Sequence, residues 1–548
     1  MATDDGLRKR QVHSAPLSPP KQEEPPPPTQ SYSRCSNTLL SLLILYRFIN
    51  ALLVQTRFVP DEYFQSIEVS YYMNYQRGHL TWEWRRGLRG YTHPFLFFLI
   101  YKILTITGTN SQWMISESPK IFQSLIAAAS DWFIYKLTLI MFNCKETAKY
   151  ALLCHIFSWF IFYCCTRTLS NTMESSLSPM ILYYWIKALN TNDSISNKTM
   201  CDYTRTSLHT SLYLVLMALS VLVRPTGVIL WAPFCLIHLI IIIRRGGGAS
   251  GERGRRKWVE FRKTLIIMII VIFLSLLWSI LIDRFYYGKW VFVQYEFLKF
   301  NILEGRSSNF GTHPWHWYIS QGFPAMLFSF LPLLVHGLYI SSINSYNPLH
   351  SLSPLAAAVI LLIVHSFIKH KEFRFVLPSL TLSIPYIGLS VSSLLNRNSK
   401  VIKVIVIILI LINVPMSLYF SIIHQRGDVS VMKHLRQSVN SSSSVLFLLP
   451  CYSTPLYSYL HGDHQLQFLE CLPDDGFPNI ETEFYSSPLD WLLIHIKDPP
   501  THIVFYDVLL SKIEEYLHNN SYVQEAKLFH THFKDNDKTG QYILVYTS

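Results

Sequence analysis

The stretch that decides the fold is TLLSLLILYRFINALLVQTRFVPDE, which covers residues 38–62. Its apolar part, residues 38–56, is long enough to cross about 30 Å of hydrocarbon as a helix. The stretch ends in Pro60-Asp61-Glu62, and carboxylates at a membrane edge are costly unless water solvates them or the protein uses them. It therefore predicts a membrane helix that brings an acidic pair to the membrane surface.

Further apolar runs repeat this pattern along most of the chain. They span 93–107, 120–142, 149–165, 173–189, 208–222, 225–243, 264–283, 322–340, 354–369, 373–393 and 401–423. Half of the 548 residues are apolar and only 15% are charged, whereas a soluble domain carries about 25% charged residues. The sequence thus predicts an all-α polytopic membrane protein.

The basic residues indicate which loops face the cytosol. The formal net charge is +12, and much of the excess lies in residues 244–263 and 396–403, each beside an apolar run. Such clusters are typical of cytosolic loops. If the N-terminus is cytosolic and every early run crosses, however, residues 244–263 fall in the lumen. We therefore expect one early run to be re-entrant or broken, near 166–175 or at Arg224-Pro225.

Composition divides the chain into three parts. Residues 1–37 are rich in proline and predict a disordered cytosolic tail. Residues 38–423 predict the multi-span domain, with lumenal loops at 57–92 and 284–321 whose Trp and Tyr content suits an interface. Residues 424–548 predict a small lumenal α/β domain. Its expected strands are 445–449, 503–506 and 542–546, and its expected helices are 429–439, 489–496 and 509–518.

Two kinds of residue would mark a lumenal C-terminal domain. Cys451 and Cys471 could form a disulfide there, because that compartment is oxidising. Glycosylation sequons begin at Asn440 and Asn519. Two more begin at Asn192 and Asn197, in a loop whose side of the membrane the sequence leaves open.

Polar side chains gather in the first lumenal loop and interrupt the later apolar runs. Taken singly, each is explained by a helix cap, by snorkelling or by a local ion pair. Taken together, they predict an aqueous face that suits a lipid phosphate and a sugar acceptor. The candidates are Asp61, Glu62, Glu83, His93, Arg167, Glu174, Arg224, Lys371 and Arg374.

Three motifs of other enzyme classes are missing from the sequence, and a fourth is missing from the predicted lumenal loops. There is no GxxxxGK[ST] phosphate loop, no GxSxG and no HExxH, and the lumenal loops lack the DxD spacing of a nucleotide-sugar metal site. We therefore expect neither a metal nor a cofactor, and no nucleic-acid partner.

Several motifs, in order, resemble the dolichyl-phosphate-mannose-using mannosyltransferases of glycosyltransferase family 22. They are PDE at 60–62, TWEW at 81–84, GYTHP at 90–94, TRTLSNTMES at 166–175, LVRPTG at 222–227 and HKEFRFVLP at 370–378. The resemblance covers about residues 40–548. One departure is Val59, where relatives often carry His, and it puts in doubt a catalytic role at that position. Residues 286–305, 310–324 and 448–461 resemble the branch that adds the third mannose of the glycosylphosphatidylinositol (GPI) precursor.

This resemblance implies a fold and an activity. The fold would be of the GT-C type, with the active site at the lumenal surface of the endoplasmic reticulum membrane. The donor would be dolichyl-phosphate mannose, a co-substrate rather than a cofactor. The acceptor would be a GPI precursor bearing two mannoses, and the product would carry a third mannose in α-1,2 linkage.

The implied chemistry assigns roles to the candidates. A β donor and an α product require inversion, for which one carboxylate acting as a general base suffices. We expect Asp61 to be that base, with Glu62 as the alternative or as a positioning partner. Arg167, Arg224, Lys371 and Arg374 are candidates for the leaving phosphate, and His93, His313 and His316 are candidates for sugar or phosphate contacts. Trp82, Trp84, Trp315 and Trp317 either stack on sugars or anchor the interface.

Other functions remain open at this point. A sibling enzyme would add the fourth GPI mannose or act on the N-glycan precursor with the same donor. A lipid transporter or scramblase would perform no transfer, although the sequence lacks the internal repeat typical of many transporters. A structural membrane subunit would leave the intramembrane charges without a use.

Overall fold

The computed structural model describes residues 30–190, 200–246, 252–306, 311–344, 346–440, 442–471 and 479–548. Most of the Pro-rich tail and the sequons at Asn192 and Asn197 lie outside these ranges. Helix α1 begins at Gln30, so the tail that the sequence predicts to extend to residue 37 gives way to helix earlier.

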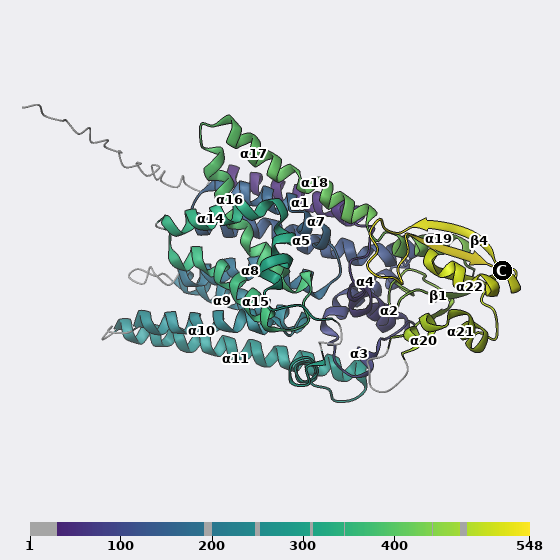
Figure 1. The fold of residues 1–548 in the computed structure, drawn as a ribbon. Helices are drawn as coiled ribbons and strands as arrows, with labels where there is room; N and C mark the ends of the chain where they lie inside the picture. The colour runs from purple at the N-terminus through teal and green to yellow at the C-terminus, as the bar shows by residue number, and fades with distance from the viewer. Residues whose placement is uncertain are drawn as a thin grey trace, which may run out of the picture.

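A bundle of long helices forms the larger part of the molecule (Figure 1). Its helices are α1 (Gln30–Leu53), α5 (Gln112–Phe142), α6 (Lys145–Phe157), α7 (Trp159–Cys164), α8 (Ser170–Asn190), α9 (Met200–Val223), α10 (Gly227–Gly246), α11 (Glu252–Tyr287), α13 (Phe323–Leu327), α14 (Leu331–Ile343), α15 (Pro348–Phe367), α16 (Leu377–Leu395), α17 (Lys400–Leu411) and α18 (Asn413–Leu418). Short helices join them: α12 (Val293–Leu298), η3 (Lys299–Leu303), η5 (Tyr318–Gly322), η6 (Phe328–Phe330), η7 (Phe373–Val376) and η8 (Tyr419–Ile423).

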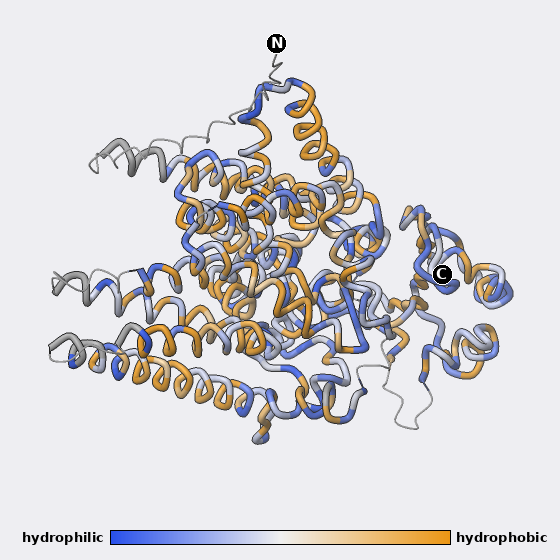
Figure 2. Tube along the Cα trace, turned by 60° about the vertical axis from the view of Figure 1, so that its left-hand side comes forward, coloured by the Kyte–Doolittle hydropathy of each residue, from blue (hydrophilic) through white to orange (hydrophobic). Residues whose placement is uncertain are grey.

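The bundle is built to lie in a membrane. Eight helical segments among the described residues are long and apolar enough to cross one, and their outward faces carry many exposed large hydrophobic side chains. Figure 2 shows hydrophobic residues along most of these helices, whereas the C-terminal part is mixed. The same bundle also contains helix α1, the consecutive helices α6 and α7, and helix α8. The chain is therefore a multi-pass membrane protein.

Helix α4 (Thr92–Ile106) corrects the expected topology. The sequence predicts a crossing at 93–107, but 15 helical residues span only about 22 Å. Both ends of α4 contact the same side of the molecule. Tyr91 N, just before α4, donates to Asp283 near the end of α11 (2.8 Å), and Thr105 near its other end accepts from Asn74 of the first loop (2.9 Å). Helix α4 is thus the early apolar run whose two ends both contact this side of the molecule, which makes it a better candidate for a run that does not cross than the two breaks that the sequence suggested.

If α4 is not counted as a membrane crossing, the two basic segments lie on the same side of the membrane. The end of α10 and the start of α11, and likewise the end of α16 and the start of α17, lie at the end of the bundle opposite the C-terminal domain (Figure 1). The described residues of the basic segments 244–263 and 396–403 lie at these helix ends. The number of crossings before residues 244–263 is then compatible with the cytosolic position that their positive charge predicts.

A buried ion pair holds the first helices of the bundle together. Arg47 of α1 donates Nε and Nη2 to the two oxygens of Asp131 on α5, both at 2.7 Å. His155 of α6 contacts the same carboxylate at 2.6 Å. All three side chains are buried. A buried charge is costly unless an opposite charge neutralises it, so loss of either partner should destabilise the bundle.

The C-terminal domain is a five-stranded mixed sheet with helices on both faces. The strand order is β2-β1-β3-β5-β4, with β1 parallel to β2 and β3, and β5 antiparallel to β3 and β4. The strands are β1 (Ser444–Leu448), β2 (Gln465–Phe468), β3 (His502–Tyr506), β4 (Val523–Phe529) and β5 (Tyr542–Thr547). The helices are α19 (Gly427–Ser438), α20 (Ile480–Ser486), α21 (Pro488–His495), the turn η9 (Asp507–Leu509) and α22 (Leu510–Asn519).

Successive side chains of each strand point to opposite faces of this sheet. Val445 and Phe447 pack on α19 and on the first loop of the bundle. Leu446 and Leu448 pack on the other face against α20, α21 and α22. The three predicted strands and three predicted helices are confirmed within a residue or two, and the sheet face with α19 is the one that meets the membrane domain.

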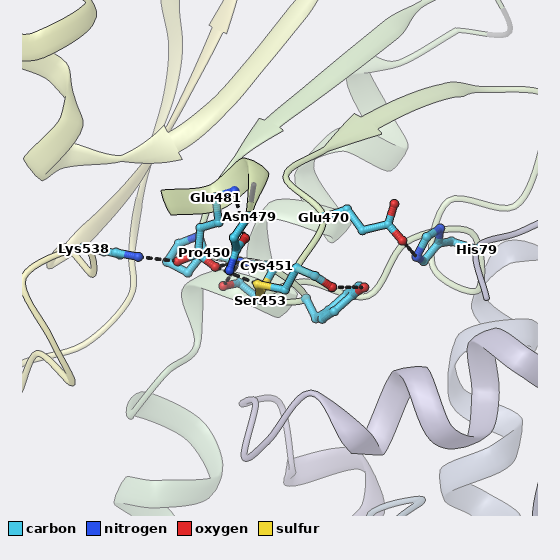
Figure 3. The surroundings of a disulfide bond; sticks show 10 residues. His79, Pro450, Cys451, Ser453, Glu470, Asn479, Glu481 and Lys538 are labelled. Atoms are coloured by element: carbon cyan, nitrogen blue, oxygen red, sulfur yellow. Dashed lines mark hydrogen bonds and ion pairs between the residues drawn. A yellow bond between two sulfur atoms is a disulfide. The ribbon is translucent and has the colours of Figure 1, made fainter. Parts of the chain in front are cut away.

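The structure contains the disulfide that the sequence left open. Cys451 and Cys471 are bonded, with their Cα atoms 5.7 Å apart. Figure 3 shows Glu481 beside the bond, with its carboxylate also accepting from Lys538 at 2.6 Å. The bond fixes the loop after β1, which contacts the first loop of the bundle.

Candidate active site

The acidic pair lies where the first membrane helix meets the C-terminal domain. The backbone after α1 is tied to the end of η8: Gln55 N donates to Ser421 O (2.8 Å) and Arg57 N donates to Gln425 O (3.1 Å). Pro60 then starts a new helix, its carbonyl accepting from Tyr63 N and Phe64 N. This continues as η1 (Tyr63–Ile67) and α2 (Glu68–Tyr75). Since neighbouring residues of a helix point in different directions, Asp61 and Glu62 face different surroundings.

Glu62 faces the interior. Its carboxylate accepts from Arg167 Nη1 at 2.9 and 3.2 Å and from Phe58 N at 3.2 Å. Arg167 is itself held by the carbonyls of Thr56 (2.6 Å) and Tyr163 (2.8 Å). The Glu62 side chain is 4% exposed and that of Arg167 is 2% exposed. This buried ion pair therefore connects the first loop to the segment that follows α7.

Asp61 faces a more open side. Its side chain is 24% exposed, and Oδ2 accepts from Arg374 Nη1 at 2.5 Å. Arg374 also donates Nε and Nη2 to Glu372, at 2.7 and 2.8 Å, and Glu372 pairs with His370 at 3.0 Å. The HKEFR segment thus supplies a chain of alternating charges that ends on Asp61.

Electrostatics favour the ionised forms of Glu372 and His370. Burial alone would raise the pKa of Glu372, but the Arg374 charge and the hydrogen bonds from His370 and Arg374 outweigh burial and hold that pKa well below its ordinary value. Burial alone would lower the pKa of His370, but its bond to Glu372 raises it above the ordinary value. Arg374 is therefore shared between two carboxylates and has no Nη or Nε left without a partner.

Arg89 and Glu83 form the second side of the site. Arg89 Nη2 donates to Glu83 at 2.6 Å, and Gln65, one turn after Asp61, donates to the other oxygen of Glu83 at 3.3 Å. Burial would lower the pKa of Arg89, but the charges of Glu83 and Asp61 outweigh it and raise that pKa. Helix α3 (Trp82–Arg85) places Glu83 here because Trp84 is buried and bonded to Phe64 O (3.0 Å).

Arg224 and Glu174 form the third side. Arg224 Nε lies 3.3 Å from Glu174 Oε2, and its guanidinium lies 5.0 Å from the centre of the Phe375 ring. Among the described residues, Glu174 Oε1 has no hydrogen-bond partner although it is buried. Gly227 begins α10 beside this carboxylate, and a Cβ there would lie 3.3 Å from Oε1. Arg224 thus has donors that are not used by other side chains in the described part of the chain.

The remaining candidates are less close to this centre or are already committed. Lys371 is buried and donates to the carbonyls of His313 (3.0 Å) and Ile368 (2.5 Å). His313 is exposed and stacks on Trp317 (4.6 Å between centroids), and His316 pairs with Ser320 (3.0 Å). His93 is buried in the first turn of α4, where its Nε2 has no hydrogen-bond partner among the described residues.

The structure therefore corrects the expected phosphate contacts. Arg167 and Lys371 do not fit that role, because their donors already satisfy Glu62 and backbone carbonyls. Trp84 and Trp317 are buried, so they do not present open faces to a sugar; Trp315 is 65% exposed.

The sequence analysis gave no role in the site to Arg89, and it noted His370 and Glu372 only as polar residues between two apolar runs. The alternation of charges in HKEFR was the available signal for the last two. Arg89 lies among other arginines of the first loop, and no pattern in the sequence distinguishes it from them.

The C-terminal domain holds the acidic segment at both of its ends. Before it, Arg57 Nε lies 2.8 Å from Asp428 on α19. After it, Glu68 Oε1 accepts from Leu456 N (2.8 Å), Ser458 N (3.1 Å) and Ser458 Oγ (2.5 Å). The position of Asp61 between these ties is therefore set partly by the C-terminal domain.

Replacement of Glu68 by Met should loosen this attachment. Met fills similar space but accepts no hydrogen bond, so the two backbone N–H groups lose their partner at about 1–3 kcal/mol each. We expect a lower unfolding temperature in detergent micelles and weaker activity. Glu68→Gln keeps an acceptor oxygen and should lose much less. Equal unfolding temperatures for the Met and Gln variants would contradict the role assigned to these bonds.

A metal has no evident site in the described part of the chain. The only group of potential ligands there is Cys451, Cys471 and Glu481, and its two sulfurs are joined to each other. The cations around Asp61 are arginines.

Comparisons with known proteins identify the family of the chain. A model of the Alg9-like mannosyltransferase family matches residues 38–461. "GPI alpha-1,2-mannosyltransferase 3" of Bos taurus is 36% identical over 99% of this chain and 95% of its own length. The Xenopus laevis protein of that name is 37% identical over 93% and 90%, and "GPI mannosyltransferase 3" of Drosophila melanogaster is 32% identical over 87% and 81%.

The fold is similar to that of a solved structure. ArnT from Cupriavidus metallidurans, bound to undecaprenyl phosphate, superposes with a TM-score of 0.59 at 8% identity, covering 94% of this chain and 98% of that one. This likeness concerns the fold alone, and it confirms the GT-C architecture that the sequence predicts.

Proposed function

Since the chain belongs to the Alg9-like mannosyltransferase family, we propose that it transfers a mannose in α-1,2 linkage to the GPI glycolipid precursor. The mannose is the third, the donor is dolichyl-phosphate mannose, and the acceptor already bears two mannoses. The observation that carries the proposal is similarity over nearly the whole chain to relatives named for this activity. The partly exposed Asp61, paired with Arg374 and close to the charge of Arg89, supports it.

The first half of the proposed reaction is deprotonation of the acceptor. Asp61 is the carboxylate that a sugar hydroxyl can reach, because Glu62 is buried under Arg167. Asp61 takes the hydroxyl proton while the oxygen attacks C1 of the mannose from the face opposite the phosphate. Arg374 holds Asp61 in place from one side, and Glu372 and His370 hold Arg374.

The second half is departure of dolichyl phosphate. The bond from C1 to the phosphate oxygen breaks, and its electron pair remains on the phosphate. Aligned cations stabilise such growing charge. Arg224 suits this role, because Glu174 is its only carboxylate partner in the described part of the chain and the contact is loose (3.3 Å). Arg89 adds positive charge from the side of Glu83.

We expect the transfer to need no divalent metal, because arginines supply the positive charge. Adding a chelator such as EDTA to purified enzyme should leave the initial rate unchanged. A loss of rate that Mn²⁺ or Mg²⁺ restores would contradict this assignment of charge stabilisation.

The same proposal orients the chain in the endoplasmic reticulum membrane. The basic connections at 244–263 and 396–403 face the cytosol, as does the N-terminus. Asp61 and the C-terminal domain lie at the opposite end of the bundle and face the lumen. The disulfide between Cys451 and Cys471 suits an oxidising compartment.

Glycan mapping tests this orientation. Asn440 and Asn519 are exposed and should carry glycans, whereas Asn192 and Asn197, which follow α8, should carry none. Removal of glycans from wild type and from Asn440→Gln and Asn519→Gln, followed by gel mobility, reads the sites out. Glycans at the α8–α9 connection would reverse the orientation.

Acceptor choice tests the function itself. Purified enzyme with labelled dolichyl-phosphate mannose should extend a two-mannose GPI lipid, and α-1,2-mannosidase should remove the new residue. Extension of a three-mannose GPI lipid or of an N-glycan precursor instead would favour a sibling enzyme. Lipid movement without any transfer would favour a transporter.

A further inference from the structure

A second cluster of cations lies apart from Asp61, where α5 meets α19. On α19, Val429, Lys433 and Arg436 follow at spacings of four and three, so they share one helix face. Lys120 of α5 is close enough to Lys433 for their charges to interact. A small hollow beside this cluster is lined by Lys120 and Val429 together with Tyr459, Glu62 and Arg167. The hollow is therefore bounded by both the bundle and the C-terminal domain.

The donors of this cluster are incompletely used. Arg436 Nε donates to Tyr459 O at 2.8 Å, but its Nη2 is buried with no hydrogen-bond partner in the part of the chain that the structure describes. Lys433 forms neither an ion pair nor a hydrogen bond with any described residue. Lys120 contacts Glu117 at 2.5 Å. Buried nitrogen donors normally find a partner, so this geometry lacks an acceptor.

The charges are also unbalanced. Lys120, Lys433 and Arg436 face a single carboxylate, Glu117, because Glu62 on the far wall is already paired with Arg167. Burial, and then the neighbouring positive charges of Lys120, Arg426 and Arg436, lower the pKa of Lys433. Burial likewise lowers the pKa of Arg436. Like charges held together in this way are stabilised by an anion.

The hollow is also separate from the proposed reaction centre. Glu62 and Tyr63 line it, whereas Asp61 pairs with Arg374. A ligand bound here would not need to contact the reacting atoms.

We propose that Lys120, Lys433 and Arg436 form a binding site for the phosphate ester of a lipid headgroup. Arginine and lysine together suit phosphate, which accepts several charge-assisted hydrogen bonds. The site lies at the boundary of the apolar bundle, where headgroup phosphates reside. The phosphate belongs either to a phospholipid of the bilayer or to the glycolipid acceptor, and only the second source depends on the function proposed above.

Binding of short-chain lipids to the full-length protein in detergent tests this site. The probes are dioctanoyl phosphatidylinositol, dioctanoyl phosphatidylcholine and dioctanoylglycerol, titrated by calorimetry. The double variant Lys433→Gln/Arg436→Gln should bind both phosphate lipids about tenfold or more weakly, since each lost charge-assisted bond is worth over 1 kcal/mol. Lys512→Gln/Lys527→Gln, which removes two exposed charges of the same domain, should bind as wild type does.

The outcomes separate the sources and the alternatives. Equal affinity for the inositol and choline lipids would assign the site to bilayer phospholipid in general, and preference for the inositol lipid would restrict it to anionic inositol phospholipids, the class to which the acceptor belongs. Affinity for dioctanoylglycerol equal to that for the phosphate lipids, or unchanged binding by the Lys433 and Arg436 variant, would overturn the site. Phosphatidylinositol should raise the unfolding temperature of wild type and not of this variant. Lipid binding by a wild type that transfers no mannose would leave the site standing and defeat the proposed function.

Discussion

Asp61→Asn should abolish mannose transfer while leaving the protein folded. A general base contributes about 10²–10⁴-fold to a rate, and an amide cannot take the acceptor proton. The fold should survive because Arg374 keeps its two bonds to Glu372. Single-turnover transfer from labelled donor, measured beside the unfolding temperature, checks both parts. Transfer within threefold of wild type would remove Asp61 from the role of base.

The neighbouring carboxylate provides the matched control. Glu62→Gln removes the charge that neutralises Arg167 in a buried place, and breaking such a pair costs about 3–5 kcal/mol. We therefore expect poor yield of folded protein and a lower unfolding temperature, with activity lost in proportion. If Glu62→Gln instead folds normally and is inactive, the roles of the two carboxylates are the reverse of those assigned here.

Arg224→Gln should slow the chemical step. Loss of one donor aimed at developing charge typically costs about 10²–10³-fold in turnover. The donor KM should change less, because the charge on the phosphate grows as the bond breaks. Affinity for the product dolichyl phosphate should fall as well, since its phosphate carries more charge than the diester of the donor.

Two further variants separate chemistry from structure at this position. Arg224→Lys keeps the charge and should recover part of the rate. Arg284→Gln removes another arginine, one that lies over Trp290 at 5.4 Å, and should leave the rate unchanged. An Arg224→Gln variant that loses only folded protein, with normal turnover per folded molecule, would restrict Arg224 to neutralising Glu174.

Hydropathy predicted the helices well and the topology less well. Each apolar run corresponds to helix in the structure, because burying apolar side chains in a bundle or in lipid satisfies the same requirement. The run at 93–107 is as apolar as a crossing helix, and only its pairing with α2 and the end of α11 indicates that it does not cross. Such contacts join residues far apart in the chain, so no local pattern contains them.

For the candidate site, too, local sequence patterns were informative and contacts between distant residues were not predictable. The family motifs contain Asp61, Glu83, Arg224 and Arg374, and they remain predicted members of the site. The sequence could not tell that Arg167 neutralises Glu62 or that Lys371 holds backbone carbonyls, since both facts depend on the direction of a side chain. In the C-terminal domain the apolar strands β1, β3 and β5 were predictable, whereas the polar edge strands β2 and β4 lack a buried face to mark them.

The most direct test of the central claim uses membranes from cells in which GPI assembly stops after the second mannose. This chain is expressed there, labelled dolichyl-phosphate mannose is supplied, and the GPI lipids are separated. The account predicts one added mannose, sensitive to α-1,2-mannosidase, with wild type and none with Asp61→Asn at equal expression. No added mannose with wild type, or label in another lipid only, would contradict it.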